Sequence, residues 1–443
     1  MLGWGLHLGI DESYMVVAGR GPLEWSYFDH PPLSWWMSRI SATLTGSEAS
    51  LLVRLPFIAL FALSTWLMAR LALLFGDYKA AFWAALAFNL SPVFGVSSGG
   101  WVLPDGPLDA TLLGAAICTV HALRSGAWRW WIGTGLCFGL AMLAKYTAAL
   151  SGFGLVLYLL TTPNQRRWFV RPQLYVAGLI ACAVFTPVLI WNAQNGFASL
   201  AFQSGRAAAA SLHPFGPLIV LAGEAAFLLP WIWAGLIRVW LPAFRTDGRL
   251  LAFLAAPPIV LFCVVALWSR QVLFHWAAPG YLMLYPLLGI WLAPKIWAPR
   301  AGWATAGLLG VVAMVVMVLI RLPLDLPKDP LLQARDWTEL RDAVADSTLP
   351  VVGTSWADTG KLGIAIGPGR AVYCLSPDER EFHFRAHPAL GSDVLIIAPR
   401  ATLAQMQARY AGNFASVSEL RRVRVSATEF TIFVGHGLTR WPS

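Results

Sequence analysis

Long apolar segments dominate residues 50–321 and constrain the fold more than any other feature of the chain. Of the 443 residues, 57% are hydrophobic, 12% are charged and 23 are Trp. A water-soluble domain of this size could neither expose nor bury so much apolar surface. Helices of about 20 apolar residues are long enough to cross a bilayer. The sequence predicts ten such helices, over residues 50–75, 79–98, 106–124, 128–144, 147–161, 174–192, 215–240, 250–268, 274–293 and 302–321.

The Lys and Arg residues between these helices fall into two unequal sets. Alternate loops on one side hold only Lys145, Arg206 and Arg270, and those on the other side hold twelve basic residues. The larger set consists of Arg70, Lys79, Arg124, Arg129, Arg166, Arg167, Arg171, Arg238, Arg245, Arg249, Lys295 and Arg300. Because basic residues are retained in the cytoplasm, the smaller set, the first 49 residues and the chain after Arg321 are predicted to lie outside it. These loops and the tail also explain the net charge of +9, so nucleic acid is not implied as a partner.

The N-terminal 49 residues do not form a complete span. Residues 1–10 are apolar but about half the length that a bilayer requires, and we expect them to be the last turns of a truncated first helix. Two amphipathic stretches follow in the outer loop 11–49, Ser13–Gly19 and Pro32–Leu44. Amphipathic segments rich in aromatic residues fit the headgroup layer. We expect both to lie along the membrane surface.

The composition changes after residue 322. Short β-branched runs alternate with helical patterns in residues 323–443, which indicates a small α/β domain in water. Cys374 is the only cysteine of this segment, so no disulfide can form within it. The predicted organisation is therefore a membrane domain over residues 1–322 and a soluble domain over residues 323–443.

Polar motifs gather on the predicted outer side of the helices. Ionised groups next to hydrocarbon are costly unless they are paired or in use. The motifs are Asp11-Glu12, Tyr27–Pro32, Pro104–Asp109, Lys145-Tyr146, and Arg270 with His275-Trp276. Their position predicts an active site that meets a lipid-borne anionic substrate.

Each acid also has a structural interpretation. Asp11 or Glu12 could take a proton from an acceptor hydroxyl, or form a polar anchor. The two prolines after His30 hold Asp29 and His30 in extended backbone, either for binding or as a simple turn. Asp105 precedes a helix, where an N-cap and a role in the cavity are both compatible with its position.

The basic groups have the same two interpretations. Lys145, next to Tyr146, could extend its ammonium group to the interface, or bind the phosphate of a lipid donor as a point charge. Arg270 could hold a phosphodiester in bidentate fashion, and His275 could donate a hydrogen bond to it. The alternative for each is a purely structural role.

The ordered motifs resemble those of a known family. They are DE at residues 11–12, YFDHPP at 27–32, RLP at 54–56, PDGPLD at 104–109, KYT at 145–147 and HWAAPGYL at 275–282. In this order they resemble bacterial members of glycosyltransferase family 39, over residues 11 to about 322. That family includes protein O-mannosyltransferases and the transferases that add aminoarabinose or galacturonic acid to lipid A or its core. The resemblance implies a GT-C fold, mainly α, with a multi-helix membrane bundle and a small C-terminal α/β domain.

The resemblance also implies an activity and a location. It implies inverting transfer of a sugar from a polyprenyl-phosphate donor to an envelope acceptor, either lipid A or its core, another glycolipid, a polysaccharide or a protein. The enzyme would be a multi-pass protein of the bacterial inner membrane, with its active site and C-terminal domain in the periplasm. The donor phosphate would be held by Lys145 and Arg270, assisted by His30 or His275, as the prenyl tail stays in lipid.

Family positions match individual residues of this chain. The acid of the first outer loop corresponds to Asp11, with Glu12 beside it, and the aromatic-acid position corresponds to Tyr27 and Asp29. The acid of the second outer loop corresponds to Asp105. His30 stands where the aminoarabinose branch has a Lys, which puts the same donor sugar in doubt. The resemblance leaves room for a divalent metal near Asp11, Asp29 and Asp105, although the sequence has no decisive ligand set.

Two other classes remain open. A lipid-linked sugar transporter or flippase would be expected to carry ionisable groups or broken helices near the bilayer midplane, and Glu224 is the main residue of that kind here. A non-catalytic scaffold that binds glycolipid in the envelope is the third alternative. In that case Asp11 and Asp105 could be replaced without effect.

Overall fold

The computed structural model describes residues 6–208, 211–322 and 331–442. These residues form two compact units. The helical unit contains residues 24–34 and 54–309, and the α/β unit contains the other described residues. The sequence predicts one boundary after residue 322, whereas each of these units is assembled from separate stretches of chain.

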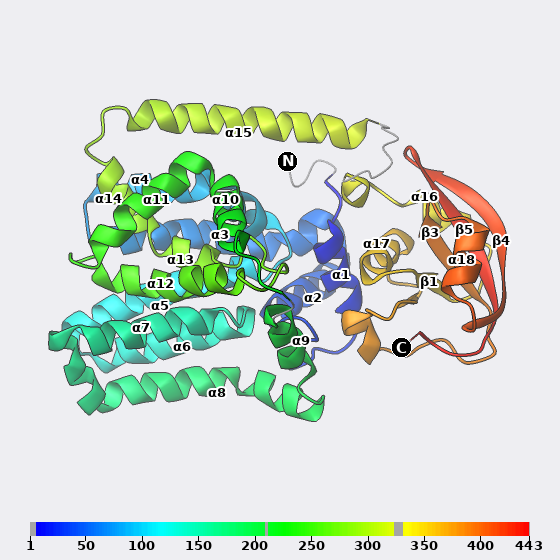
Figure 1. Ribbon diagram of the computed structural model, residues 1–443, viewed down its shortest axis with the longest axis horizontal. Helices are drawn as coiled ribbons and strands as arrows, with labels where there is room; N and C mark the ends of the chain where they lie inside the picture. Colours follow the sequence, from blue (N-terminus) through cyan, green and yellow to red (C-terminus); the bar gives the residue numbers. More distant parts are fainter. Residues whose placement is uncertain (1–5, 209–210, 323–330, 443) are drawn as a thin grey trace. The chain divides into compact units, whose positions relative to one another are not determined.

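The helical unit consists of helices, of which the first begins before the unit and the last continues beyond it (Figure 1). In chain order they are α3 (Ser50–Leu73), α4 (Tyr78–Leu90), the π-helix η1 (Val93–Ser98), α5 (Asp105–Ser125), α6 (Trp128–Ala144), α7 (Ala148–Thr161), the 3₁₀ helix η2 (Pro163–Val170), α8 (Pro172–Gln194), α9 (Ala198–Ala207), α10 (Gly216–Leu228), α11 (Pro230–Ala243), α12 (Arg249–Val265), α13 (Ala278–Leu282), α14 (Tyr285–Leu292) and α15 (Ala298–Arg321). Among the described residues, four helices are long and apolar enough to cross a membrane, or five if α10 and α11 form one bent span. These are the features of a multi-pass membrane protein, as predicted.

Three of the predicted spans are not continuous α-helices. In the segment 79–98, the α-helix α4 ends at Leu90, and the π-helix η1 follows it. The segment 215–240 bends by 112° between α10 and α11, and the segment 274–293 forms the short helices α13 and α14. Prolines follow two of these breaks, at Pro92 and at Pro230. A proline removes a backbone donor and restricts the residue before it. The other seven predicted spans each correspond to one α-helix.

Small residues allow the central helices to approach closely. The window of α5 that could span a membrane is 72% buried, and α5 packs against α6, which packs against α8. A Cβ at Gly135 of α6 would clash with the carbonyl oxygen of Ala177 in α8, and one at Gly139 would lie 2.6 Å from Cβ of Val184. Close backbone contact of this kind is typical of helices that pack in a membrane.

The α/β unit is built around one mixed sheet. Its elements are α1 (Ile10–Ala18), α2 (Leu33–Thr45), η3 (Leu332–Ala334), α16 (Glu339–Ala343), β1 (Val351–Gly353), α17 (Trp356–Ile366), β2 (Val372–Cys374), η4 (Arg380–Phe384), β3 (Val394–Pro399), α18 (Leu403–Arg409), β4 (Phe414–Val425) and β5 (Thr428–Leu438). The strand order is β2-β1-β3-β5-β4. Strand β1 is parallel to β2 and β3, and β5 is antiparallel to β3 and β4. The predicted small α/β domain is therefore confirmed.

Both faces of this sheet are covered. Alternate residues of β3 point to opposite faces, so Leu395 and Ile397 enter one apolar cluster, and Val394 and Ile396 enter another. All four side chains are buried. The central strand is therefore buried on both sides, which explains its continuous apolar sequence.

Helix α1 packs inside the α/β unit, against α17. Residues 12–18 are all buried, so the prediction that Ser13–Gly19 lies along a membrane surface is wrong. A Cβ at Gly360 of α17 would lie 2.7 Å from the backbone N of Tyr14, and this glycine permits the close crossing. The second predicted stretch, Pro32–Leu44, forms α2. Residues 6–9 are not helical, contrary to the expected helix end, and residues 1–5 lie outside the described part.

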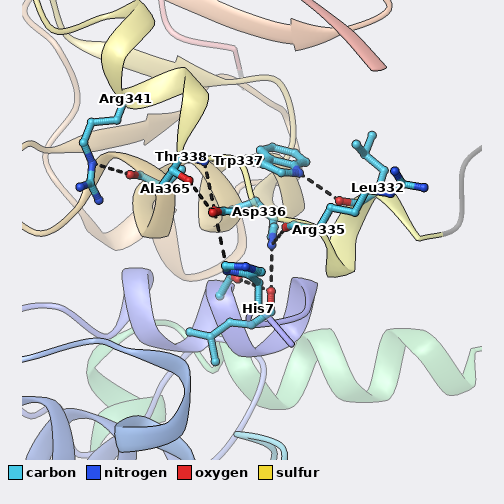
Figure 2. A network of polar contacts seen from close by, with 11 residues as sticks. His7, Leu332, Arg335, Asp336, Trp337, Thr338, Arg341 and Ala365 are labelled. Carbon is cyan, nitrogen blue, oxygen red and sulfur yellow. Dashed lines mark hydrogen bonds and ion pairs between the residues drawn. The ribbon is translucent and has the colours of Figure 1, made fainter. Parts of the chain in front are cut away.

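Polar contacts tie the segment before α1 to residues 332–338 (Figure 2). His7 Nδ1 lies 3.7 Å from Asp336 Oδ1, and the buried Lys361 donates to the carbonyl oxygens of Leu8 and Arg335, each at 3.0 Å. Partial burial acts to raise the pKa of Asp336, but the hydrogen bond from Thr338 Oγ1 and the charge of His7 outweigh it and hold that pKa below its usual value. The chain around residues 7 and 8 is therefore an integral part of this unit.

Candidate active site

A buried ion pair joins two of the predicted site residues. Asp105 is the first residue of α5, and Lys145 follows the last residue of α6 in extended conformation. Lys145 Nζ donates a hydrogen bond to Asp105 Oδ1 at 2.9 Å. The two side chains are 8% and 13% exposed. Pro104 is the N-cap of α5, so Asp105 is not the N-cap, and its carboxylate meets Lys145 instead.

Two histidines lie near this ion pair. The charges of Lys145, His275 and His30 all act on the Asp105 carboxylate. His275 lies in the turn before α13 and is half-buried, and His30 belongs to the Tyr27–Pro32 motif. The fold therefore brings together four predicted residues from four separate segments of the chain.

The Tyr27–Pro32 motif is held by contacts with α9. The side-chain amide of Gln203 donates a hydrogen bond to the carbonyl oxygen of Asp29. The rings of Phe28 and Phe202 have centroids 4.8 Å apart. Tyr27 and Asp29 are 0% and 3% exposed. The motif is thus a packed segment and not a mobile loop.

Helix α9 also contacts two further motifs. Ser199 Oγ lies 2.7 Å from the hydroxyl of Tyr146, and Arg206 Cζ lies 4.4 Å from the ring centroid of Trp276. Ser269 Oγ donates to the carbonyl oxygen of Arg206 at 2.7 Å. Helix α9 therefore links three of the five motifs. The sequence prediction missed this helix, although Arg206 is one of only three basic residues in the predicted outer loops.

Arg270 has a different environment. Its side chain is exposed, and its Nε lies 3.1 Å from His213 Nε2. Among the described residues, no hydrogen bond or ion pair connects Arg270 to Lys145, Asp105 or His275. The predicted phosphate contact of Arg270 stays a prediction.

Asp11 and Glu12 begin helix α1 in the α/β unit. Glu12 is 3% exposed, and its Oε2 accepts a hydrogen bond from the backbone N of Gly9 at 2.9 Å. This bond satisfies a backbone donor at the start of the helix. Asp11 is exposed in the same first turn. Of the two acids, Asp11 has the side chain that could meet a substrate.

Two further charged residues of the motifs are buried. Arg54 of the RLP motif is 0% exposed, and Asp109 is 2% exposed and hydrogen-bonds Ser98 of the π-helix η1. The contact of Asp109 links α5 to η1, which is a structural role.

The acids do not form a metal-ligand cluster within the described part of the chain. No group of three His, Cys, Asp or Glu side chains there has the arrangement to hold a metal ion. The carboxylate of Asp105 already has a cation, the Lys145 ammonium, at 2.9 Å. The described residues therefore do not fit the metal suggested near Asp11, Asp29 and Asp105.

Comparisons with known proteins agree with this architecture. Residues 29–191 match the family model described as dolichyl-phosphate-mannose-protein mannosyltransferase. Among solved structures, the chain resembles ArnT from Cupriavidus metallidurans in the apo state, with 15% identity, a TM-score of 0.69, and coverage of 98% of this chain and 94% of that one. It also resembles the same protein bound to undecaprenyl phosphate, with 16% identity, a TM-score of 0.70, and coverage of 98% and 95%.

A search of the curated proteins finds no match. At these identities the structural likeness establishes the fold, and the family match covers the segment that contains Asp29, Asp105 and Lys145. Together they show that the chain has a fold of the GT-C type, with a match to a mannosyltransferase family over residues 29–191.

Proposed function

We propose that this protein is an inverting glycosyltransferase that moves a sugar from a polyprenyl-phosphate donor to an acceptor of the bacterial envelope, on the periplasmic face of the inner membrane. The observation that carries the proposal is the buried Lys145–Asp105 pair, with His275 and His30 near it, in a GT-C fold. The related ArnT structure, solved with undecaprenyl phosphate bound, supports this class of donor.

Lys145 is suited to binding the donor phosphate. A lysine ammonium group has three N–H donors, and one of them is used by Asp105. Within the described part of the chain the other two have no hydrogen-bond partner, so they could bind phosphate oxygens. The hydrogen bond to Asp105 fixes the direction of the ammonium group, so the role of Asp105 is to position Lys145. The imidazole of His275 or His30 would add a further hydrogen bond to the phosphate.

The chemical step is a substitution at the anomeric carbon. The oxygen of an acceptor hydroxyl attacks that carbon on the face opposite the phosphate, and the bond from the carbon to the phosphate oxygen breaks. The leaving polyprenyl phosphate takes the electron pair and gains one negative charge, which Lys145 stabilises. The hydroxyl proton passes to a carboxylate. The family resemblance assigns this role to Asp11, and in this proposal Asp105 positions Lys145.

Mass spectrometry of envelope glycolipids and glycoproteins, from cells with and without the protein, tests the proposal and identifies the product. A hexose, pentose, uronic acid or aminosugar that disappears with the protein would name the sugar and its acceptor. An unchanged envelope would contradict the proposal.

Variants then test the residues in a reconstituted transfer assay with the donor so identified. Lys145→Ala should lower the transfer rate by about 100-fold or more, and Lys145→Arg should retain part of it because the charge remains. Asp11→Asn should lower the rate by roughly 100- to 10,000-fold if Asp11 is the base. Lys79→Ala, at an exposed position in the other set of loops, is the matched control. Full activity of Lys145→Ala would rule out the phosphate role.

A lipid-linked sugar transporter is the second candidate, and one observation favours it. Glu224 of α10 is 1% exposed, and its Oε2 accepts a hydrogen bond from the hydroxyl of Tyr281 at 2.7 Å. It lies near the 112° break between α10 and α11, and broken helices with buried acids are features of transporters. Proteoliposomes that translocate a lipid-linked sugar without transferring it, and that stop with Glu224→Gln, would favour transport over transfer.

A further inference from the structure

A cavity of about 370 Å³ lies between α4, α11, α14 and α15. In Figure 1, α4, α11 and α14 lie together at one end of the helical unit. Four indoles contribute to its wall, from Trp83, Trp231, Trp291 and Trp297. Its volume falls within the range of roughly 300–1,000 Å³ that is typical of ligand pockets. The Lys145–Asp105 pair does not line it.

The wall of this cavity is almost entirely hydrocarbon. Small residues, including Gly235 and Gly302, leave the space open, and a Cβ at Gly302 would lie 3.4 Å from the ring of Trp83. Thr305 contributes a hydroxyl group to the wall. Its Oγ1 accepts from Trp231 Nε1 at 3.1 Å and donates to the carbonyl oxygen of Ala301 at 2.8 Å. Since this polar group is already satisfied, the cavity suits an apolar occupant.

Two basic groups flank the indole of Trp291 in the cavity wall. Arg238 Cζ lies 5.7 Å from the ring centroid, and Lys295 Nζ lies 5.4 Å from it. The side chain of Arg238 lines the cavity and carries a positive charge. It is exposed. Within the described part of the chain, neither cation has an ion pair with a carboxylate. An apolar cavity with two cations beside it is complementary to a lipid that has an anionic headgroup.

We propose that this cavity binds an acyl chain of an anionic phospholipid, whose phosphate is held by Arg238 and Lys295. Both residues belong to the basic loops that the sequence places in the cytoplasm, whereas Lys145 belongs to the opposite set. The occupant is therefore a phospholipid of the cytoplasmic leaflet and not the sugar donor.

This lipid would join α15 to the rest of the helical unit. The window of α15 that could span a membrane is only 6% buried, and Ala298 and Thr305 are its buried residues. Both of them line the cavity. A chain bound there would contact α15 on one side and α4, α11 and α14 on the other, and would add to the hydrogen bond between Trp231 and Thr305.

The test is lipid binding to the delipidated full-length protein, measured by native mass spectrometry with added phosphatidylglycerol or phosphatidylcholine. The wild-type protein should bind phosphatidylglycerol about 30-fold more tightly, as expected for two basic residues at a membrane surface. Arg238→Gln combined with Lys295→Gln should abolish this preference and leave chain binding. Arg245→Gln, at an exposed position outside the cavity, is the matched control and should keep it.

A second variant tests the cavity itself. Ala301→Phe places a ring in the space, and Ala304→Phe places the same ring on an exposed position of α15 that does not line it. The first should lose binding of both lipids, and the second should bind as the wild type does. Equal binding by all variants would overturn the proposal, as would displacement of phosphatidylglycerol by equimolar undecaprenyl phosphate. If Ala301→Phe does not fold, the double charge variant decides the question alone.

Discussion

The ammonium of Lys145 lies 2.9 Å from the carboxylate of Asp105, although one residue follows α6 and the other begins α5. Both groups are largely buried. The sequence predicted separate roles for them, with Lys145 as a contact for the donor phosphate and Asp105 as the acid of the second outer loop. Their pairing means that a change at either residue acts on both, and it supports a positioning role for Asp105.

Removal of Asp105 should destabilise the helical unit. Asp105→Ala leaves the Lys145 charge buried without its partner, and breaking such a pair costs about 3–5 kcal/mol. Asp105→Asn keeps a hydrogen-bond acceptor and should cost less. The measurement is unfolding in a denaturing detergent, followed by circular dichroism.

The double variant Asp105→Leu with Lys145→Met is the control for this prediction. It removes both charges and should recover most of the stability lost in Asp105→Ala, because the desolvation cost of both ions disappears. A double variant that is less stable than either single variant would contradict the idea that the unpaired charge is the cause.

Loss of the Gln203 side chain should loosen the Tyr27–Pro32 motif. Gln203→Leu removes the donor to the Asp29 carbonyl oxygen, and one such bond contributes about 0.5–1.5 kcal/mol. Hydrogen exchange of the backbone amides in residues 24–34 should therefore become roughly 2- to 10-fold faster. Mass spectrometry of the exchanged peptides measures this.

Gln194→Leu is the matched control, because Gln194 is exposed at the end of α8. It should leave exchange in residues 24–34 unchanged. If both variants exchanged at the wild-type rate, the contacts of Phe28 with Phe202 would be sufficient to hold the motif.

The sequence predicts the positions of most helices because apolar length and proline placement are local properties. The helices α3, α5 and α8 each lie close to their predicted ranges, since each is predominantly apolar over 21 to 24 residues. Pro230 is a local signal for the break between α10 and α11. However, a proline can also be accommodated within a helix, as Pro187 is in α8. Its effect on the chain therefore depends on tertiary contacts.

Other features depend on contacts that are distant in sequence. Residues 13–19 are apolar enough for a membrane surface, and only the packing of α1 against Gly360 shows that they are buried in the α/β unit. For the same reason, the sequence predicted Lys145, Asp105 and the histidines as site residues but not α9, whose role comes from contacts of Gln203 and Arg206 with segments far away in the chain.

The Cys374 thiol should make the α/β unit sensitive to alkaline pH. Burial raises the pKa of Cys374 to about 12, whereas an unfolded chain has a thiol pKa of about 8.5. Between these values the folded state keeps a proton that the unfolded state releases, so stability falls as the pH rises through this window. Cys374→Ala should lose this part of the pH dependence, which thermal unfolding from pH 7 to pH 10 would measure. Identical slopes for both proteins would contradict the prediction.

Gly360→Ala should destabilise the α/β unit, although alanine is the better helix former. Replacing glycine inside a helix normally gains about 1 kcal/mol. Here the new Cβ would lie 2.7 Å from the backbone N and 2.8 Å from the Cα of Tyr14, and backbone atoms cannot move aside as a flexible side chain can. Overpacking of this kind costs about 1–3 kcal/mol, so we expect a net loss of stability.

The control for Gly360 is Gly369→Ala in the same unit. No atom lies within 4 Å of a Cβ at Gly369, so this change should alter stability by less than about 0.5 kcal/mol. Differential scanning calorimetry of the full-length protein compares the two variants. Equal transitions for Gly360→Ala and the wild type would mean that α1 can shift away from α17 at no cost. The close crossing would then be a consequence of packing elsewhere in the unit and not the contact that holds α1 in place.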